Sequence, residues 1–219
     1  MPRSLIAALS ALPLIAVAQP ALAQEMAPPP AGEYRADMTH ASIIAYLDHL
    51  GFSRYPVRFT RFDIAMDFDP DAPEAMSVAA QIEVSSLETH YPGEDVDFNA
   101  ELTGPQWLDA ASHPQIRFQS NAVETTGDDT ARVAGTLSFM GVDRPVTLDV
   151  RFNGGYAGMV PYDPQARIGF SATAQFDRSE FGLTYGLPPE GTNFGVGDTV
   201  SVIIEAELTG PALTAADGE

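Results

Sequence analysis

The residues best suited to acid–base chemistry or metal binding near neutral pH are four histidines, His40, His49, His90 and His113. No two of them stand at the i, i+4 spacing with which a helix presents two imidazoles to zinc. His49 shares its parity with Ile43, Ala45 and Leu47, so in a strand it would lie at the end of their face. There it could donate a hydrogen bond to a ligand head group, or it could be a hydrogen-bonded structural histidine, which is the commoner role.

Other patterns that carry chemistry are incomplete or absent. The acidic string Asp67 to Asp71 resembles the start of a calcium loop, but Ala72 stands where glycine is needed and Val78 where glutamate is needed. The chain has no G-x-S-x-G, G-x-G-x-x-G or P-loop pattern and no cysteine. We therefore expect no catalytic residues, no metal and no cofactor, with an enzyme that uses His49 and a nearby carboxylate as the alternative.

Apolar side chains at every second position dominate the rest of the chain and predict antiparallel strands with one wet face. The stretch GTLSFMGVDRPVTLDVRF, residues 135 to 152, reads as a hairpin with a tight turn near Gly141. We identify eight such faces. Their residues are Ile43/Ala45/Leu47, Phe62/Ile64/Met66/Phe68, Val78/Ala80/Ile82/Val84, Ile116/Phe118/Ala122, Val133/Leu137/Phe139, Val146/Leu148/Val150/Phe152, Ile168/Phe170/Ala172/Ala174/Phe176 and Val200/Val202/Ile204/Ala206/Leu208.

The pattern is interrupted between residues 93 and 113, where apolar residues do not alternate and one or two short helices are predicted. The acidic residues Glu94, Asp95 and Asp97 would cap a helix N-terminus there. Eight strands with this single excursion favour a closed, all-β, eight-stranded antiparallel barrel over a sandwich, because closure leaves no unpaired edge.

The inward face of this barrel combines large residues with small ones, namely Ala45, Ala80, Ala122, Gly135, Ala172, Ala174 and Ala206. An eight-stranded barrel is wide enough either to be filled by side chains or to hold one small ligand, so small residues favour a cavity. The alternative is that Phe98 and Trp107 fill the space. By parity, the residues expected to line the lumen are Ile43, Ala45, Leu47, His49, Phe62, Ile82, Phe118, Phe139, Val150, Phe152, Phe170, Ala172, Ala174, Phe176, Val202 and Ile204.

The N-terminus combines Arg3, an apolar run and the small-residue site at residues 21 to 23, which predicts a signal peptide over residues 1–23 and a periplasmic location. Proline-rich residues 24–33 and the tail, residues 210–219, are expected to be flexible. The formal net charge of −19 disfavours nucleic acid and anionic lipid surfaces as partners.

Several segments together resemble the YceI-like family. These are YRADMTHASIIAYLDHLGFS from Tyr34, FTRFDIAMDFDP, VSSLET, LDAASHPQIRFQS, the turn GTLSFMGVDRPV, DRSEFGL and VGDTVSVIIEAEL. The resemblance covers residues 34–209. The chain departs from the family pattern at Ala41, Ala45 and Asp143 and in the segment GLPPEGTNFGVG.

The resemblance implies a lipocalin-like barrel whose lumen takes a polyisoprenoid or a related amphiphile such as an isoprenoid quinone. We accordingly expect a non-enzymatic lipid-binding or carrier protein. The alternative is an accessory module with a filled barrel, which contacts a membrane b-type cytochrome or another quinone-handling protein. The family has no single catalytic motif to transfer, so the lumen residues rest on parity alone.

Overall fold

The computed structural model describes residues 26–213, so the predicted signal peptide lies outside the described residues. The strands are β1 (Gly32–His49), β2 (Ser53–Phe59), β3 (Phe62–Phe68), β4 (Ser77–Glu83), β5 (Leu87–Glu88), β6 (Gln115–Gly127), β7 (Thr130–Phe139), β8 (Val142–Tyr156), β9 (Gln165–Asp177) and β10 (Val196–Ala212). The helices are α1 (Phe98–Thr103) and the short 3-10 turns η1 (Pro73–Ala75), η2 (Val84–Ser86) and η3 (Arg178–Phe181).

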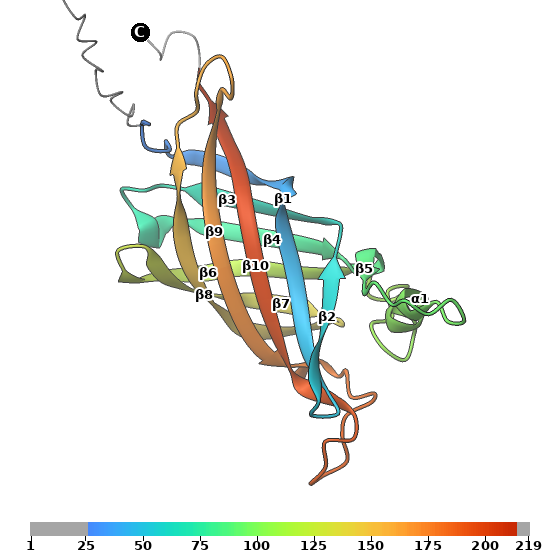
Figure 1. The fold of residues 1–219 in the computed structure, drawn as a ribbon. Coiled ribbons are helices and arrows are strands. Elements are labelled where there is room, and N and C mark those ends of the chain that lie inside the picture. Colours follow the sequence, from blue (N-terminus) through green and yellow to red (C-terminus); the bar gives the residue numbers. More distant parts are fainter. Residues whose placement is uncertain (1–25, 214–219) are drawn as a thin grey trace, which may run out of the picture.

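The predicted eight-stranded antiparallel barrel is confirmed. The sheet runs β10-β9-β8-β7-β6-β4-β3-β1, and β1 pairs again with β10 to close the ring of eight (Figure 1). In the closing pair, Arg35 lies opposite Thr209 and Leu47 lies opposite Val200. Because each strand of the ring pairs on both sides, the closed ring hides the backbone edges that a sandwich would expose.

Strand β1 is shared between two partners on its other side. Its first residues pair with β3, where Arg35 lies opposite Ala65, and its last residues pair with β2, where Ile43 lies opposite Phe59. The sequence interpretation missed β2 because Pro56 interrupts it. Proline is tolerated here because β2 pairs on its far side only with the two-residue strand β5, at Arg58 and Phe59, so Pro56 faces an open edge.

The excursion between residues 93 and 113 contains the predicted short helix, α1, which lies beside β5 at the flank of the barrel (Figure 1). The side chain of Asp97 accepts a hydrogen bond from the backbone N–H of Ala100 at 3.0 Å, so one of the three acidic residues is the N-cap. The acidic string after β3 is a solvated turn, in which the Asp69 carboxylate accepts from the Asp71 N–H.

One face was assigned wrongly beyond the middle of β6. A register shift between Ser120 and Ala122 inserts an extra residue, so Ser120 lies opposite Gly135 and Val123 opposite Val133. A bulge of this kind reverses the parity of the strand. Ala122 is therefore exposed and does not line the interior.

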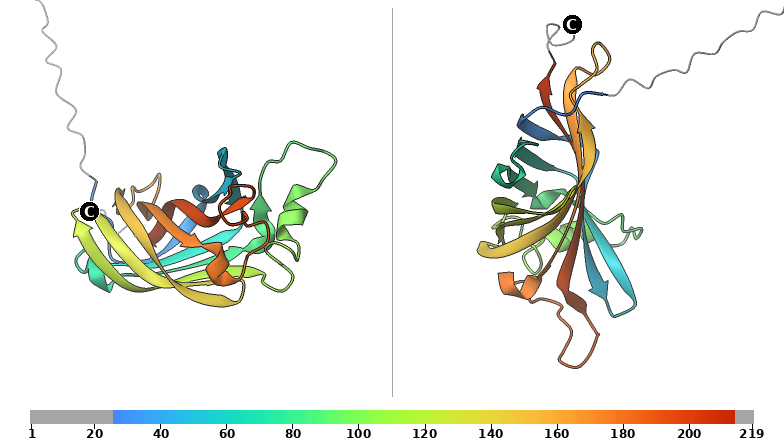
Figure 2. Two further views of the ribbon diagram at one scale, coloured as in Figure 1. Left: turned by 90° about the horizontal axis from the view of Figure 1, so that it is seen from below. Right: turned by 90° about the vertical axis from the view of Figure 1, so that its left-hand side faces the viewer.

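Both described ends of the chain lie at the same end of the barrel, and the 186–197 loop lies at the other (Figure 2). Residues expected as a leader and a tail are partly ordered here. The Ala27 carbonyl accepts a hydrogen bond from the Ala157 N–H at 2.9 Å, and β10 continues to Ala212. Within residues 26–213, no helix is long and apolar enough to cross a membrane.

Candidate functional site: an apolar cavity in the barrel

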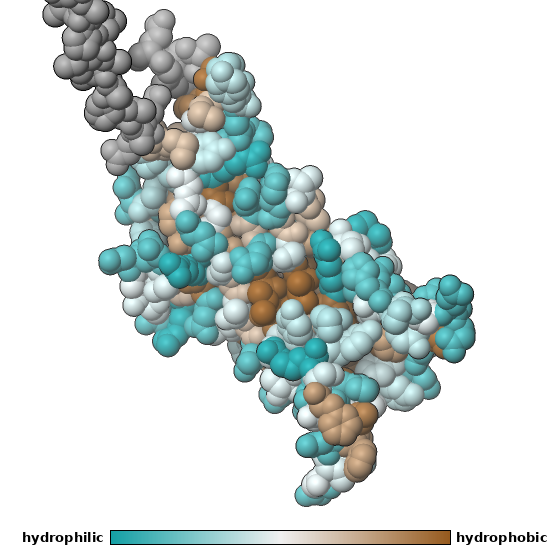
Figure 3. Space-filling view, viewed as in Figure 1, coloured by the Kyte–Doolittle hydropathy of each residue, from teal (hydrophilic) through white to brown (hydrophobic). Residues whose placement is uncertain are grey.

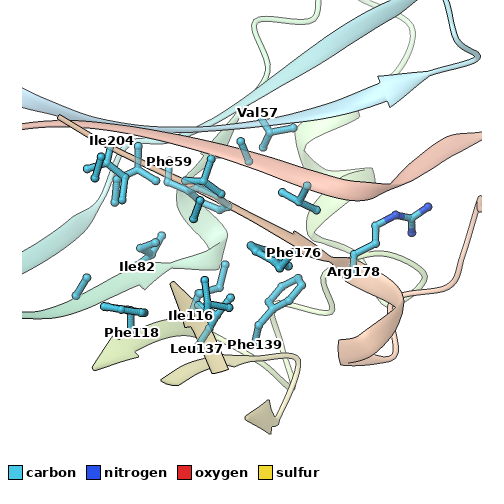
Figure 4. Close-up of a pocket in the computed structure, with 18 of the residues that line it drawn as sticks. Val57, Phe59, Ile82, Ile116, Phe118, Leu137, Phe139, Phe176, Arg178 and Ile204 are labelled. Atoms are coloured by element: carbon cyan, nitrogen blue, oxygen red, sulfur yellow. The ribbon is translucent and has the colours of Figure 1, made fainter. Parts of the chain in front are cut away.

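The barrel encloses a cavity of about 690 Å³, a volume within the usual range for small-molecule sites (Figure 4). Its wall is almost wholly apolar and takes residues from strands all around the ring. Alternation explains this wall, because every second side chain of each strand points inward. The cavity is therefore a consequence of the same period-two pattern that predicts the strands.

The structure places most of the expected lumen residues on this wall. They are Ile43, Ala45, Leu47, His49, Ile82, Phe118, Phe139, Val150, Phe170, Ala172, Ala174, Phe176, Val202 and Ile204. Their position is a geometric fact, whereas their contact with a ligand stays a prediction.

Two expected lumen residues lie elsewhere. Phe62 stands at the start of β3, beyond the part of that strand that pairs with β1, and packs against the core without lining the cavity. Phe152 lines a second, smaller cavity of about 310 Å³ that also includes Phe68 and Phe170. Parity gave the correct side of the strand for Phe152 but could not show that the lumen is divided along its length.

Small side chains provide part of the cavity. Ala45, Ala80, Ala172, Ala174 and Ala206 all line it, as their pattern predicts. Gly135 has a different role, because a Cβ atom there would lie 2.3 Å from the ring of Phe118. Glycine at this position lets the Phe118 ring lie against β7 and form part of the wall.

Other wall residues were missed by the sequence interpretation. Tyr55, Val57 and Phe59 of β2 line the cavity, and their own alternation is the signal that could have identified them. Phe98 and Trp107, considered as residues that would fill the barrel, also line the cavity. They cover the space and leave it hollow.

Four aromatic rings close one end of the barrel, which we call the aromatic end: Tyr34, Phe68, Phe152 and Phe170. The tilted rings of Phe152 and Phe170 lie 5.2 Å apart, and those of Phe68 and Tyr34 lie 5.4 Å apart edge to face, both between ring centroids. The Tyr34 hydroxyl donates to the Pro30 carbonyl at 2.7 Å, so its polar atom is satisfied. Burial raises the pKa of Tyr34 to about 12.

The opposite end carries the polar groups of the wall, and we call it the polar end: Asp48, His49, Trp107 and Arg178. Figure 4 shows Arg178 at the margin of the lining side chains, beyond Phe176. His49 is exposed and its side chain makes no hydrogen bond to any residue in the range 26–213. The interpretation of His49 as a hydrogen-bonded structural histidine is therefore not supported within residues 26–213.

Arg178 is fully buried, with a relative exposure of 0%. Its guanidinium donates to four backbone carbonyls at 2.8–2.9 Å, those of Leu183, Tyr185, Val196 and Gly197. Desolvation lowers the pKa of Arg178, although its guanidinium stays protonated at any physiological pH. The side chain, at the start of η3, thus ties together the backbone on both sides of the 186–197 loop.

Trp107 lies against this cradle. Its ring stands 5.0 Å from that of Tyr185 and 5.9 Å from the Arg178 guanidinium carbon. Gly186 adopts a positive φ of 71°, and a Cβ there would lie 3.1 Å from the indole, so the loop packs closely on the ring. The Trp107 Nε1 atom is buried and has no hydrogen-bond partner in the described chain.

A cluster of Asp37, His40 and Glu207 on the outer surface has the donor types of a metal site. Arg167 already donates to Asp37 at 2.9 Å and to Asp163 at 2.6 Å. Hydrogen bonds from Thr39, His40 and Arg167 hold the pKa of Asp37 well below its usual range. The cluster is thus organised as an ion-pair network around the Arg167 cation.

Comparison with known proteins agrees with this architecture. A family model described as a YceI-like domain matches residues 34–208. Among curated relatives, a protein of Pseudomonas putida named "UPF0312 protein" is 33% identical over 155 residues, which is 70% of this chain and 77% of the relative.

Solved structures show the same fold at low identity. BcnA from Burkholderia cenocepacia has a TM-score of 0.66 at 22% identity and covers 78% of this chain and 98% of its own. A domain from Saccharophagus degradans, described as polyisoprenoid binding, has a TM-score of 0.60 at 12% identity. That match covers 83% of this chain and 99% of the domain.

Proposed function

Because this chain belongs to the YceI-like family, we propose that its barrel holds a polyisoprenoid or a related amphiphilic lipid, such as an isoprenoid quinone. The observation that carries the proposal is the apolar cavity of about 690 Å³ inside a closed barrel. The description of the Saccharophagus degradans domain as polyisoprenoid binding supports the same occupant. In this proposal the protein is a secreted carrier or sequestering protein of the periplasm, and it performs no chemistry on its ligand.

Burial of the hydrocarbon chain against the apolar wall provides enough free energy for binding. Burial of one five-carbon isoprene unit contributes about 4 kcal/mol before ordering costs, at about 0.8 kcal/mol per carbon. A few units therefore suffice for binding without a charged contact. This agrees with a wall on which charged side chains occur only at the polar end.

Two other functions were considered on the sequence. The cavity disfavours a partner-binding module with a filled barrel. In a lipid carrier, contact with a membrane quinone or cytochrome protein would be transient and would deliver the ligand. An enzyme based on His49 would need a carboxylate that orients its imidazole. None is bonded to it among residues 26–213.

The test is to identify the lipid that the protein carries. The full chain would be expressed in its own cells and purified from the periplasm, and the bound lipids extracted and measured by mass spectrometry. We expect an isoprenoid in stoichiometric amount, and a much smaller amount in an Ala174→Trp variant purified in parallel. A wild-type protein that contains no isoprenoid, and takes none up from vesicles, would overturn the proposal.

A further inference from the structure

Trp107 carries a hydrogen-bond donor that the protein leaves unused. Its Nε1–H is buried against the cavity, yet no acceptor within residues 26–213 lies in reach. A buried donor without a partner is destabilising relative to a satisfied one. Since buried indole N–H groups usually find a partner, this donor indicates an acceptor that comes from outside the chain.

Arg178 places a positive charge beside this donor. A guanidinium has five N–H groups, and the four carbonyls of its cradle account for four of them. No ion pair within 4.0 Å is formed by Arg178 in the described chain, and the Asp198 carboxylate, whose charge raises the Arg178 pKa, accepts its hydrogen bonds from Ser179. The Arg178 charge is therefore solvated mainly by carbonyl dipoles and has no directly bonded carboxylate.

Other charged groups around the polar end do not complete an anionic partner for Arg178. Asp48 lines the same end, but its Oδ1 atom accepts from the Gly51 N–H at 2.7 Å in the β1–β2 turn. His49 follows it and is exposed. The Arg178 guanidinium carbon lies 5.9 Å from the Trp107 ring centroid, so the unused donor and the cation border the same end of the cavity.

The aromatic end offers nothing comparable. Its rings contact one another, and its polar atom, the Tyr34 hydroxyl, already donates to Pro30. An amphiphile in the main cavity consequently has one end where an oxygen acceptor gains a hydrogen bond and one end lined by aromatic rings. The smaller cavity beyond Phe170 carries the carboxylates of Asp128 and Asp129, which accept hydrogen bonds and repel an anionic head group.

We propose, on the basis of the proposed function, that the lipid has a head group with an acceptor oxygen, held by Trp107 and Arg178, and an apolar chain directed at Phe170. The shared chemistry is an oxygen that accepts hydrogen bonds and carries full or partial negative charge. A carboxylate, a phosphate and a quinone carbonyl all have it, whereas an ammonium group does not. The head group therefore fixes the orientation of the chain.

Trp107 is the only tryptophan of the chain, so fluorescence excited selectively at tryptophan reports on this site alone. The test uses four probes with the same twenty-carbon isoprenoid chain, which are geranylgeranoic acid, its methyl ester, geranylgeranylamine and the hydrocarbon without a head group. We expect the acid and the ester to bind about fivefold or more tightly than the hydrocarbon, the amount that one hydrogen bond contributes. The amine should bind most weakly. A difference between acid and ester measures the part that charge plays.

Orientation is tested by heavy-atom quenching of the same fluorescence. A probe brominated next to the carboxylate should quench Trp107 strongly, and one brominated at the far end of the chain should leave it nearly unchanged. In Trp107→Phe, assayed by retention of a radiolabelled acid, the preference for acid over hydrocarbon should fall to within about twofold. The binding of the hydrocarbon itself should stay within about twofold of wild type.

The outcomes separate this inference from the proposed function. Equal binding of acid and hydrocarbon, tightest binding of the amine, or stronger quenching by the tail bromine would each overturn the orientation while leaving a lipid-binding barrel. If none of the four probes enters the cavity and no lipid is retained by the purified protein, the proposed function fails and this inference fails with it.

Discussion

The two ends of the barrel are built from the same inward-facing positions but are closed by different interactions. At the aromatic end, four rings pack on one another beside a smaller cavity of about 310 Å³, which adjoins the main one and shares Val150 and Phe170 with it. At the polar end, Arg178 leaves the wall and holds a loop through backbone carbonyls. The comparison shows that packing of aromatic side chains closes one end, whereas hydrogen bonds from a single side chain, Arg178, to backbone carbonyls hold the other.

Removal of Arg178 should have the largest effect. Arg178→Met leaves the carbonyls of Leu183, Tyr185, Val196 and Gly197 without their shared donor. We expect a loss of about 3–5 kcal/mol in the free energy of unfolding, the cost of removing one partner from a buried polar network. Urea denaturation measures it, with Arg144→Met on the exposed surface as control. A loss below about 1 kcal/mol would show that the cradle is not what holds the polar end.

Phe170 lines both cavities, so Phe170→Ala should join them. We expect a loss of about 3 kcal/mol in stability from the vacated volume, together with a preference for longer isoprenoid chains. The control is Phe176→Ala on the same face of β9, which lines the main cavity only and should leave the chain-length preference unchanged. Binding of a series of chain lengths gives the result. The same preference in both variants would contradict a divided lumen.

Ala172 and Ala174 lie in the middle of the lumen, between the two ends. Ala174→Trp should reduce lipid binding at least about tenfold, which corresponds to about 1.4 kcal/mol. Stability should change by less than about 1 kcal/mol, because a hollow interior accepts volume that a packed core does not. Ala172→Trp should behave alike, and Thr173→Trp, on the exposed side, is the control. Unfolding of both inward variants would show that the interior is packed.

Acid should weaken the aromatic end and leave the polar end intact. Hydrogen bonds from Thr39, His40 and Arg167 depress the pKa of Asp37 in the folded state. Its contribution is therefore fully present above the ordinary aspartate pKa of about 4 and is lost as pH falls through the folded value. Urea midpoints between pH 7 and pH 3 should fall less steeply in Asp37→Asn than in wild type. Equal slopes would contradict this assignment.

The smallest effect concerns the loops. Residues 154–165 lie at the aromatic end and residues 186–197 at the polar end, beside the β1–β2 turn (Figure 1). Phe194 in this loop and Phe52 in the turn are exposed, and Figure 3 shows hydrophobic surface toward the lower tip of the molecule. We expect lipid binding to slow amide exchange in 186–197 by a few-fold and to leave 154–165 unchanged. Hydrogen exchange with mass spectrometry tests it. Equal change in both loops would place the route of uptake elsewhere.

Periodicity carried most of what could be predicted. Period two identified every strand of the closed ring, because an inward face must be apolar from end to end. It missed β2, where Pro56 breaks a short run, and it misplaced Ala122, because no residue type announces the bulge after Ser120. Bulges depend on how neighbouring strands align, which is a tertiary property.

The site was less predictable than the ring. Parity identified the inward side of each strand, but it could not show that Phe152 lies in a separate compartment or that Trp107 borders the main one. The role of Arg178 was also outside its reach. The partners of this side chain are backbone carbonyls of a loop with no periodic pattern.

Closure of the ring has a consequence for the order of folding. From β6 to β10, each strand pairs with the strand that follows it in the sequence. By contrast, the β1–β10 pair joins residues such as Arg35 and Thr209, which are separated by most of the chain. Contacts so distant in sequence form slowly, because the intervening chain must first be ordered. Until β1 pairs with β10, each of the two strands keeps one free edge and the lumen is open along that seam. Pairing of β1 with β10 and enclosure of the lumen are therefore the same step.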